Sequence, residues 1–492
     1  MTHPFLYEIN TRCWLRTLSE EQGRPVTLAT VPETEFQQWL KLGFTHIWLM
    51  GVWTTGPRSR SHALHDPQLR KRYSEILPGW HEQDVPGSPY AIADYEVPTT
   101  LGGEGELKSF RERLNKHGLK LILDFVPNHV GLDYPWITAW PELLIHSSQK
   151  QSGTFQQKTL RGTLWLAHGK DPHFSPWTDT AQLDYRLTST RTAMIQLLKS
   201  IANKCDGVRC DMAMLLLNDV FAKTWAHFPS AEAMPKEEFW SLAIATIKQE
   251  HPEFLFLAEA YWDRQAQLQS LGFDYTYDKH VYDCLVEHRY ADLQKHLLEV
   301  TPEYLAKSVH FLENHDERRI ASVLSLAEHR AAALLILGLP GMRFVYEGQL
   351  TGALIHTPVQ LGRCRKKKIN PDIEAMYQEL LAALKATAIG NGEGKVLHPL
   401  AAWPENPTAQ NFIIIQWQRL PNEFNLVVVN LASHRSQCRV HLDLAGLTQH
   451  DWQMRDLLDR EVYLRHGGEL AQEGLFLDLP EHGAQLFQCL LG

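Results

Sequence analysis

Short apolar segments alternate with longer amphipathic segments along most of the chain. In the longer stretches, apolar residues recur at spacings of three and four, which is typical of helices that bury one face. This alternation predicts repeated βα units around a parallel sheet, and eight strands fit one closed (β/α)₈ barrel of the TIM type. The predicted strands are residues 5–10, 45–50, 120–125, 207–211, 254–259, 273–275, 308–312 and 342–346, and the predicted helices include 33–42, 104–117, 191–203, 237–250 and 327–337.

Two intervals are too long to be simple connections between these elements. Residues 53–90 are rich in Pro, Gly, His and Arg and predict a long loop at the barrel mouth, whereas residues 130–186 predict a small domain inserted after the third strand. From about residue 394, strand-like segments with Gly and Pro between them predict a C-terminal antiparallel β-sandwich. We therefore expect four parts: barrel at 1–129, inserted domain at 130–186, barrel at 187–393 and sandwich at 394–492.

The net charge and the apolar segments of the chain limit the kinds of partner that we expect it to bind. The formal net charge of -9 argues against broad attraction to nucleic acid or to an anionic membrane. The most apolar segment, residues 331–339, is far shorter than the roughly 20 residues that a bilayer crossing needs. One basic run, residues 363–368, could contact phosphate but is more typical of a solvated loop.

The cysteines and the N-terminus predict a cytoplasmic protein. Seven cysteines form an odd set without a C-x-x-C pair, which favours reduced thiols over a disulfide framework or a zinc site. The first ten residues have Glu8 within their apolar stretch and lack the basic start of a secretory signal.

Four acidic residues lie at or just after the ends of predicted strands: Asp124, Asp211, Glu259 and Asp316. In a (β/α)₈ barrel the carboxyl ends of the strands converge on one face, where the active sites of this fold are built. Carboxylates far apart in the sequence are therefore expected to meet there.

The motifs around these carboxylates resemble, in order, the four sequence regions of the α-amylase family (glycoside hydrolase family 13). They are DFVPNH at 124–129, GVRCD at 207–211, AEA at 258–260 and NHD at 314–316. Two flanking segments, QLDYR at 182–186 and YEG at 346–348, add to the likeness, which runs from about residue 5 to residue 348.

The resemblance implies a retaining glycosidase acting on α-1,4-glucans or maltooligosaccharides. It assigns Asp211 as the nucleophile, Glu259 as the general acid/base and Asp316 as the third carboxylate, which assists at the sugar. Arg209 precedes Asp211 by two residues, so on a strand both side chains face the same way and Arg209 can keep Asp211 ionised. The apolar run before Glu259 favours a raised pKa for that carboxyl.

Other residues receive roles from the same resemblance. Tyr90, His129 and His315 are similar to residues that stack on, or hydrogen-bond, the sugar that is cleaved. Tyr261 and Trp262 follow Glu259 and could contact the leaving-group side, with packing as the alternative.

Two further residues are interpreted as support for the site. Asp124 would hold Arg209. Asn128 resembles a residue of a structural calcium site, but an asparagine that bonds loop backbone fits equally well. The proposed chemistry requires no cofactor or metal.

Three functions remain open at this stage. Hydrolysis and glucan transfer use the same covalent intermediate and differ only in whether water or a sugar hydroxyl attacks it. Met212, Ala213, Met214 and Leu215 stand where many starch-degrading members of the family place a Lys-His pair, so the subsite contacts of those members do not carry over. A non-catalytic, glucan-binding barrel is the third possibility, although all three carboxylates are present.

Overall fold

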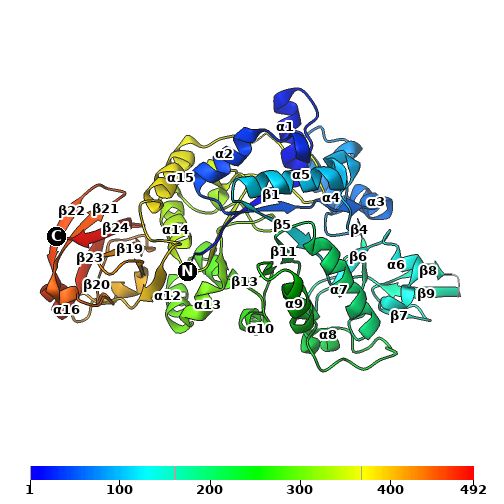
Figure 1. Ribbon diagram of the computed structural model, residues 1–492. Helices are drawn as coiled ribbons and strands as arrows, with labels where there is room; N and C mark the ends of the chain where they lie inside the picture. Colours follow the sequence, from blue (N-terminus) through cyan, green and yellow to red (C-terminus); the bar gives the residue numbers. More distant parts are fainter. Residues whose placement is uncertain (1, 160–161, 367) are drawn as a thin grey trace.

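The computed structural model describes residues 2–159, 162–366 and 368–492 (Figure 1). Its centre is a closed barrel of eight parallel strands, in the order β1-β15-β14-β13-β12-β11-β5-β2. The barrel strands are β1 (Phe5–Asn10), β2 (His46–Met50), β5 (Lys120–Phe125), β11 (Gly207–Cys210), β12 (Leu255–Ala258), β13 (Tyr275–Tyr277), β14 (Ser308–His310) and β15 (Met342–Tyr346). The predicted (β/α)₈ barrel is confirmed.

Helices surround the barrel, as Figure 1 shows. Each of the five helices expected from the apolar spacing is present within a few residues of its predicted bounds. The helices of the barrel are α1 (Thr11–Gln22), α2 (Glu33–Leu42), α5 (Gly103–Lys116), α7 (Thr188–Ala202), α8 (Asn218–Thr224), α9 (Phe239–Glu250), α10 (Gln265–Ser270), α11 (Lys279–Val286), α12 (Tyr290–Glu299), α13 (Pro302–Ala306), α14 (Leu326–Gly338) and α15 (Pro371–Leu384).

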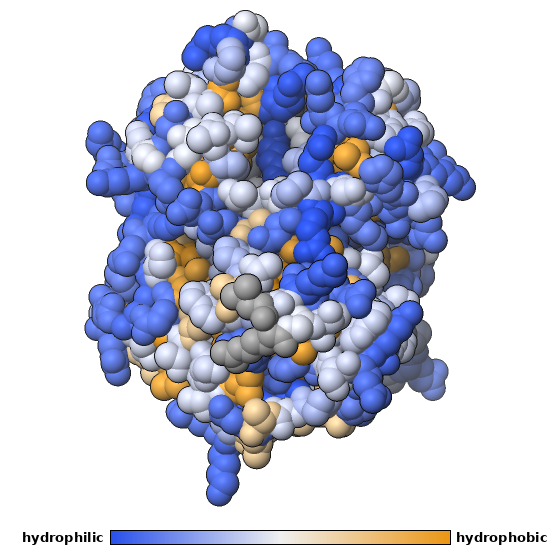
Figure 2. Space-filling view, turned by 90° about the vertical axis from the view of Figure 1, so that its right-hand side faces the viewer, coloured by the Kyte–Doolittle hydropathy of each residue, from blue (hydrophilic) through white to orange (hydrophobic). Residues whose placement is uncertain are grey.

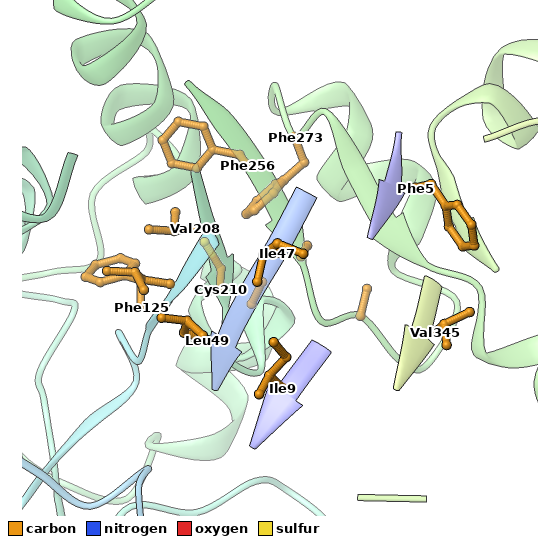
Figure 3. Close-up of a cluster of buried hydrophobic side chains, with 14 of the residues drawn as sticks. Phe5, Ile9, Ile47, Leu49, Phe125, Val208, Cys210, Phe256, Phe273 and Val345 are labelled. Carbon is orange, nitrogen blue, oxygen red and sulfur yellow. The ribbon is translucent and has the colours of Figure 1, made fainter. Parts of the chain in front are cut away.

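Strand residues alternate between two apolar layers. In β2, Ile47 and Leu49 pack outward against the helices, whereas Trp48 and Met50 belong to a separate cluster inside the barrel. The outward layer is drawn in Figure 3, where Val208, Cys210 and Phe256 lie with Ile47 and Leu49. Because the period is two, the residues between them on each strand point into the barrel, and this places Arg209 inside.

The prediction for the sixth strand is off by two residues. Phe273 packs outward against Trp240 and Phe256, and the Asp274 carboxylate accepts a hydrogen bond from the Phe256 N–H. The strand pairing with β12 begins only at Tyr275, because Asp274 is engaged as a cap of the neighbouring strand.

Residues 53–90, predicted as a long loop, contain regular structure. They contain α3 (Pro57–His65) and α4 (Pro67–Ile76), and each helix begins with its proline at the first position. Proline is favoured there because its missing N–H would have no helical partner. The Asp66 side chain caps α4 by accepting from the Gln68 and Leu69 N–H groups.

The basic run at residues 363–368 is partly held by residues 53–90. Arg363 pairs with Asp84 at 2.7 Å, whereas Lys367 lies outside the described residues.

Two smaller units flank the barrel on opposite sides in Figure 1. On one side is the antiparallel sheet β7-β9-β8, which falls within the predicted insert, together with β6, β10 and α6 (Trp136–Ala139). This side faces the viewer in Figure 2, where the surface is mostly hydrophilic and its hydrophobic residues form small separate patches. The bounds are β6 (His129–Gly131), β7 (His146–Ser147), β8 (Thr154–Thr159), β9 (Gly162–Ala167) and β10 (Thr180–Gln182).

On the other side, two antiparallel sheets enclose a core of their own and confirm the predicted C-terminal sandwich. One sheet has the order β16-β18-β19-β24-β21-β22, the other β17-β20-β23. Their strands are β16 (Glu393–Leu397), β17 (Leu400–Ala401), β18 (Phe412–Gln418), β19 (Glu423–Asn430), β20 (Ser436–Val440), β21 (Asp451–Asp456), β22 (Val462–His466), β23 (Leu475–Leu479) and β24 (Ala484–Leu491), and α16 (Gly467–Glu473) precedes β23.

Within the described ranges, no helix combines the length and the apolar character that crossing a membrane requires. Cys205, Cys210, Cys284, Cys438 and Cys489 are buried with their thiols unlinked.

The join between barrel and sandwich depends on Trp417. Its indole N–H donates to the Gly338 carbonyl of α14 at 2.7 Å, and its ring is fully buried. Trp417→Ala is expected to lower the free energy of unfolding by about 3–5 kcal/mol, because it removes a large buried side chain and leaves a cavity. Urea unfolding followed by circular dichroism measures the loss.

Trp403 provides the matched control, since it lies in the same domain with half of its surface exposed. Trp403→Ala should change the unfolding free energy by no more than about 0.5 kcal/mol. Equal losses in the two variants would contradict the role given to Trp417.

Candidate active site

The backbone of neighbouring strands brings two of the predicted carboxylates together. Asp211 follows β11, and its N–H donates to the Phe125 carbonyl at 2.9 Å. Glu259 follows β12, and its N–H donates to the Cys210 carbonyl at 3.1 Å. Both residues therefore continue the parallel ladder at the carboxyl end of the barrel.

Arg209 joins these two carboxylates. One guanidinium nitrogen lies 2.6 Å from Asp211 Oδ1, and another lies 2.8 Å from Glu259 Oε2. The side chain is completely buried inside the barrel, where its guanidinium lies over the rings of Trp48 and Tyr90, 5.3 Å from each ring centre. A planar cation thus holds both acids in fixed positions, as a bidentate fork allows.

Glu259 has two further hydrogen-bond donors. The Tyr261 hydroxyl donates to Oε1 and the Met212 N–H donates to Oε2, each at 2.7 Å. Met212 has a φ of 44°, in the left-handed region that non-glycine residues seldom occupy. That backbone conformation, directly after Asp211, accompanies the hydrogen bond from Met212 to Glu259.

Burial shifts the titration of the pair. It raises the pKa of both Asp211 and Glu259, while the charge of Arg209 opposes the rise in each case. The negative charge of Asp211 adds to the rise in the pKa of Glu259. The expected rise for Glu259 is present, but Arg209 only limits the rise for Asp211 instead of lowering its pKa.

Asp316 lies in the turn after β14, at the same end of the barrel. The Asn314 side chain accepts from the N–H groups of Asp316 and Glu317, both at 2.9 Å, and fixes this turn. Half of the Asp316 side chain is exposed, in contrast to Asp211 and Glu259, which are 7% and 3% exposed. Asp316 therefore marks the open side of the site.

His315 connects Asp316 to the barrel interior. Its Nδ1 lies 2.5 Å from Glu8 Oε1, and its Nε2 lies 3.0 Å from Asp316 Oδ2 and 2.7 Å from the Tyr90 hydroxyl. Desolvation would lower the pKa of His315, but the charges of Asp316 and Glu8 outweigh it and raise the pKa well above its usual value. His315 in turn overcomes desolvation at Asp316 and lowers the pKa of that carboxyl to about 2.

The remaining sugar-binding candidates lie around this centre. Tyr90 stacks on His315 with ring centres 5.3 Å apart. The His129 ring bonds the Tyr90 carbonyl through Nε2 at 3.2 Å and approaches Asn128 through Nδ1 at 3.3 Å, so both nitrogens already have protein partners. Trp262 is half-buried and meets the ring of His173, from the inserted segment, at 4.9 Å.

Asp124, expected from the sequence to hold Arg209, lies beside it in the barrel. Its Oδ2 accepts from the Gly51 N–H at 2.9 Å, and its Oδ1 lies 3.9 Å from Arg209. It contributes negative charge beside Arg209 without a direct hydrogen bond to it.

Sequence reasoning missed Glu8, Trp48 and Tyr277, which complete the walls around Arg209 and His315. A signal for Glu8 was present, because a carboxylate in the buried strand β1 needs a partner inside the barrel. Trp48 belongs to an apolar run, where the sequence has no feature that separates it from core residues, and Tyr277 lies two residues beyond the end of the predicted sixth strand.

The residues near Asn128 do not fit a calcium site. The Asn128 amide and the Gln182 amide bond each other through two contacts, at 3.0 and 3.2 Å, and both are buried. The Asp184 carboxylate is occupied by Arg186 in a bidentate pair. The oxygens that Ca²⁺ would need are thus already used, and across the described residues no group of three or more His, Cys, Asp or Glu could hold a metal ion.

Known proteins resemble this chain over both sequence and fold. A family model described as the alpha amylase catalytic domain matches residues 37–380. "Alpha-amylase MalA" of Haloarcula japonica is 24% identical over 275 residues, which are 54% of this chain and 36% of that protein. An "Alpha-1,4-glucan:maltose-1-phosphate maltosyltransferase" of Pseudomonas aeruginosa is 23% identical over 203 residues, 40% of this chain and 26% of that protein. The chain thus spans little more than a third of the first relative's length.

Two solved structures match the whole fold. A maltogenic alpha-amylase from Thermotoga neapolitana superposes with a TM-score of 0.67 at 18% identity, covering 99% of each chain. An alpha-amylase from Lactobacillus plantarum also has a TM-score of 0.67, at 21% identity, with 99% of this chain and 98% of that chain covered.

Replacing Arg209 with methionine is expected to destabilise the fold by about 3–5 kcal/mol, because two buried carboxyls lose their cation. In the variant the pKa of Asp211 and of Glu259 rises further above its unfolded value, so the native state holds protons that the unfolded state releases. Stability then falls as pH rises, and the loss should be larger at pH 8 than at pH 5. Urea unfolding at both pH values measures the difference.

Leu334→Ala is the control for this comparison. Leu334 is fully buried and carries no charge, so its replacement removes packing alone. Its loss of stability should be the same at pH 5 and pH 8. If the loss of stability in Arg209→Met were also the same at pH 5 and pH 8, it would refute the claim that Arg209 compensates the charge of the buried carboxyls.

Proposed function

Because this chain belongs to the α-amylase family, we propose that it is a retaining glycosidase that cleaves α-1,4-glucans or maltooligosaccharides through a glycosyl-Asp211 intermediate. The observation that carries the proposal is the shared contact of Asp211 and Glu259 with Arg209. Retention requires a nucleophile and a proton donor about 5 Å apart. Their contact with one guanidinium keeps the two carboxyls near each other, which supports this assignment.

The interaction between the two carboxyls gives Asp211 and Glu259 different roles in the reaction. The negative charge of Asp211 raises the pKa of Glu259, which favours a protonated Glu259 before reaction. Asp211 attacks the anomeric carbon, the glycosidic bond breaks, and the Glu259 proton goes to the leaving oxygen. Once Asp211 is an ester its charge is gone, so the pKa of Glu259 falls and Glu259 can accept the proton of the attacking water.

Asp316 and His315 act on the sugar that is cleaved. Asp316 stays ionised, because His315 lowers its pKa to about 2. A fixed carboxylate can bind sugar hydroxyls and stabilise positive charge that develops at the ring. Tyr90, stacked on His315, offers an aromatic face to the same sugar.

Glucan transfer is the second candidate, with the same residues and a sugar hydroxyl in place of water. Two observations favour it: some similar proteins bear the name of maltosyltransferases, and both reacting carboxyls are almost fully buried. A site closed to bulk water gives a bound acceptor an advantage. Hydrolysis remains the first choice.

We further propose that the protein works in the cytoplasm and without a metal ion. The buried cysteines with unlinked thiols support a reducing compartment. The pairing of Asn128 with Gln182, and of Asp184 with Arg186, supports independence from calcium.

Incubation with maltooligosaccharides of defined length, with products resolved by chromatography, tests the function. Shorter products alone, released as the α-anomer, are expected for a retaining hydrolase; longer products would establish a transferase instead. Asp211→Asn should reduce turnover by at least about a thousandfold, because an amide cannot form the ester. Asp94→Asn, at an exposed position on β4 (Ile92–Asp94), should leave turnover unchanged. Binding of the sugars without any product would favour the non-catalytic alternative.

The Tyr261 hydroxyl stabilises ionised Glu259, so Tyr261→Phe should raise the pKa of Glu259 further. Since Glu259 must be protonated to act as the acid, the alkaline limb of the kcat/KM profile should move to higher pH. Tyr275→Phe, near the amino end of the barrel, should not move it. An alkaline limb that moves to lower pH in Tyr261→Phe would exclude Glu259 as the proton donor.

A further inference from the structure

A cavity of about 790 Å³ lies outside the active site. It is lined by residues along α1 and the following residues 23–27, by β3 (Thr54–Thr55), and by residues near Gln83 and Thr100. None of the residues that line it is a site residue predicted from the sequence. Its volume is that of a small-molecule site.

The lining of this cavity is strongly positive. It includes Arg12, Arg16, Arg24 and Arg60, but only one acidic residue, Glu20, which is paired with Arg16 at 2.8 Å. Among the described residues, no carboxylate pairs with the other three arginines. Such a concentration of cations is notable in a protein with a net charge of -9.

Two of the arginines are fixed in place by backbone carbonyls. Arg12 donates to the Gly87 carbonyl at 2.8 Å, and Arg60 donates to the Val85 and Glu82 carbonyls at 2.9 and 2.7 Å. Neutral carbonyls hold a guanidinium but do not cancel its charge. Burial accordingly lowers the pKa of Arg12 to about 10.

We propose that this cavity binds a small organic phosphate, of which a sugar phosphate is the best fit. Arg12 and Arg60 are half-buried and have no carboxylate partner among the described residues, and a bound anion would supply the missing counter-charge. Guanidinium groups match the geometry of phosphate oxygens better than any other side chain. The side chains of Gln83 and Thr100 make no hydrogen bonds within the described part of the chain, so they are available to sugar hydroxyls.

Arg24 is the residue of choice for a test. It is exposed at the rim and makes no hydrogen bond or ion pair with the described residues, so its replacement leaves the fold intact. Arg12 and Arg60 are unsuitable, because they hold the segment that leads to Tyr90. Arg455 is a matched control, since it is equally exposed and unpaired but lies on β21 of the sandwich.

Isothermal titration calorimetry of the full chain at fixed ionic strength, with glucose 6-phosphate, inorganic phosphate and glucose as probes, tests the proposal. Glucose 6-phosphate should bind one per chain and more tightly than either other probe. Arg24→Gln should weaken its binding about tenfold, the effect of one lost charged contact. Arg455→Gln should not change it.

Other results would overturn the proposal in part or in full. If inorganic phosphate binds as tightly as glucose 6-phosphate, the cavity is a site for the phosphate ion, and the proposal that it recognises the sugar is wrong. No binding of either phosphate, or binding that Arg24→Gln leaves unchanged, would remove the site altogether. Neither outcome bears on the glycosidase activity, which is measured separately with maltooligosaccharides.

Discussion

A single buried guanidinium makes the centre of this barrel possible. Arg209 lies among Asp124, Asp211 and Glu259, in a region that bulk water does not reach. Without a cation, so many carboxyls could stay buried only in their neutral form. With Arg209 present, the buried carboxyls can be ionised, because its charge opposes the rise in pKa that burial causes. The reactivity proposed for the site is therefore a balance between desolvation and one positive charge.

The sequence predicted the barrel and its carboxylates because both follow from short-range rules. Buried parallel strands are nearly continuous apolar runs, and such runs located all eight strands to within two residues. An acidic residue at the end of such a run, such as Asp211 or Glu259, is expected at the face of the barrel where the carboxyl ends of the strands converge. The four motifs then identified the family that the match over residues 37–380 supports.

What the sequence did not predict depends on contacts between distant segments. The hydrogen-bonded series from Glu8 through His315 to Tyr90 joins three separate stretches, and no local pattern encodes it. The two helices in residues 53–90 were missed because their prolines were interpreted as loop residues, although proline also starts helices. The sixth strand was misplaced because Phe273 is as apolar as a strand residue, whereas the pairing with β12 begins only at Tyr275.

The position of Glu8 has a consequence for the order of assembly. Glu8 is on β1, which precedes the other barrel strands in the chain, and its partner His315 follows β14. β1 is sealed into the sheet by β15, where Glu8 is aligned with Tyr346. His315 can therefore acquire its second carboxylate only after nearly the entire barrel has been translated and its two ends have met. A chain that lacks either end of the barrel therefore lacks the contact between Glu8 and His315.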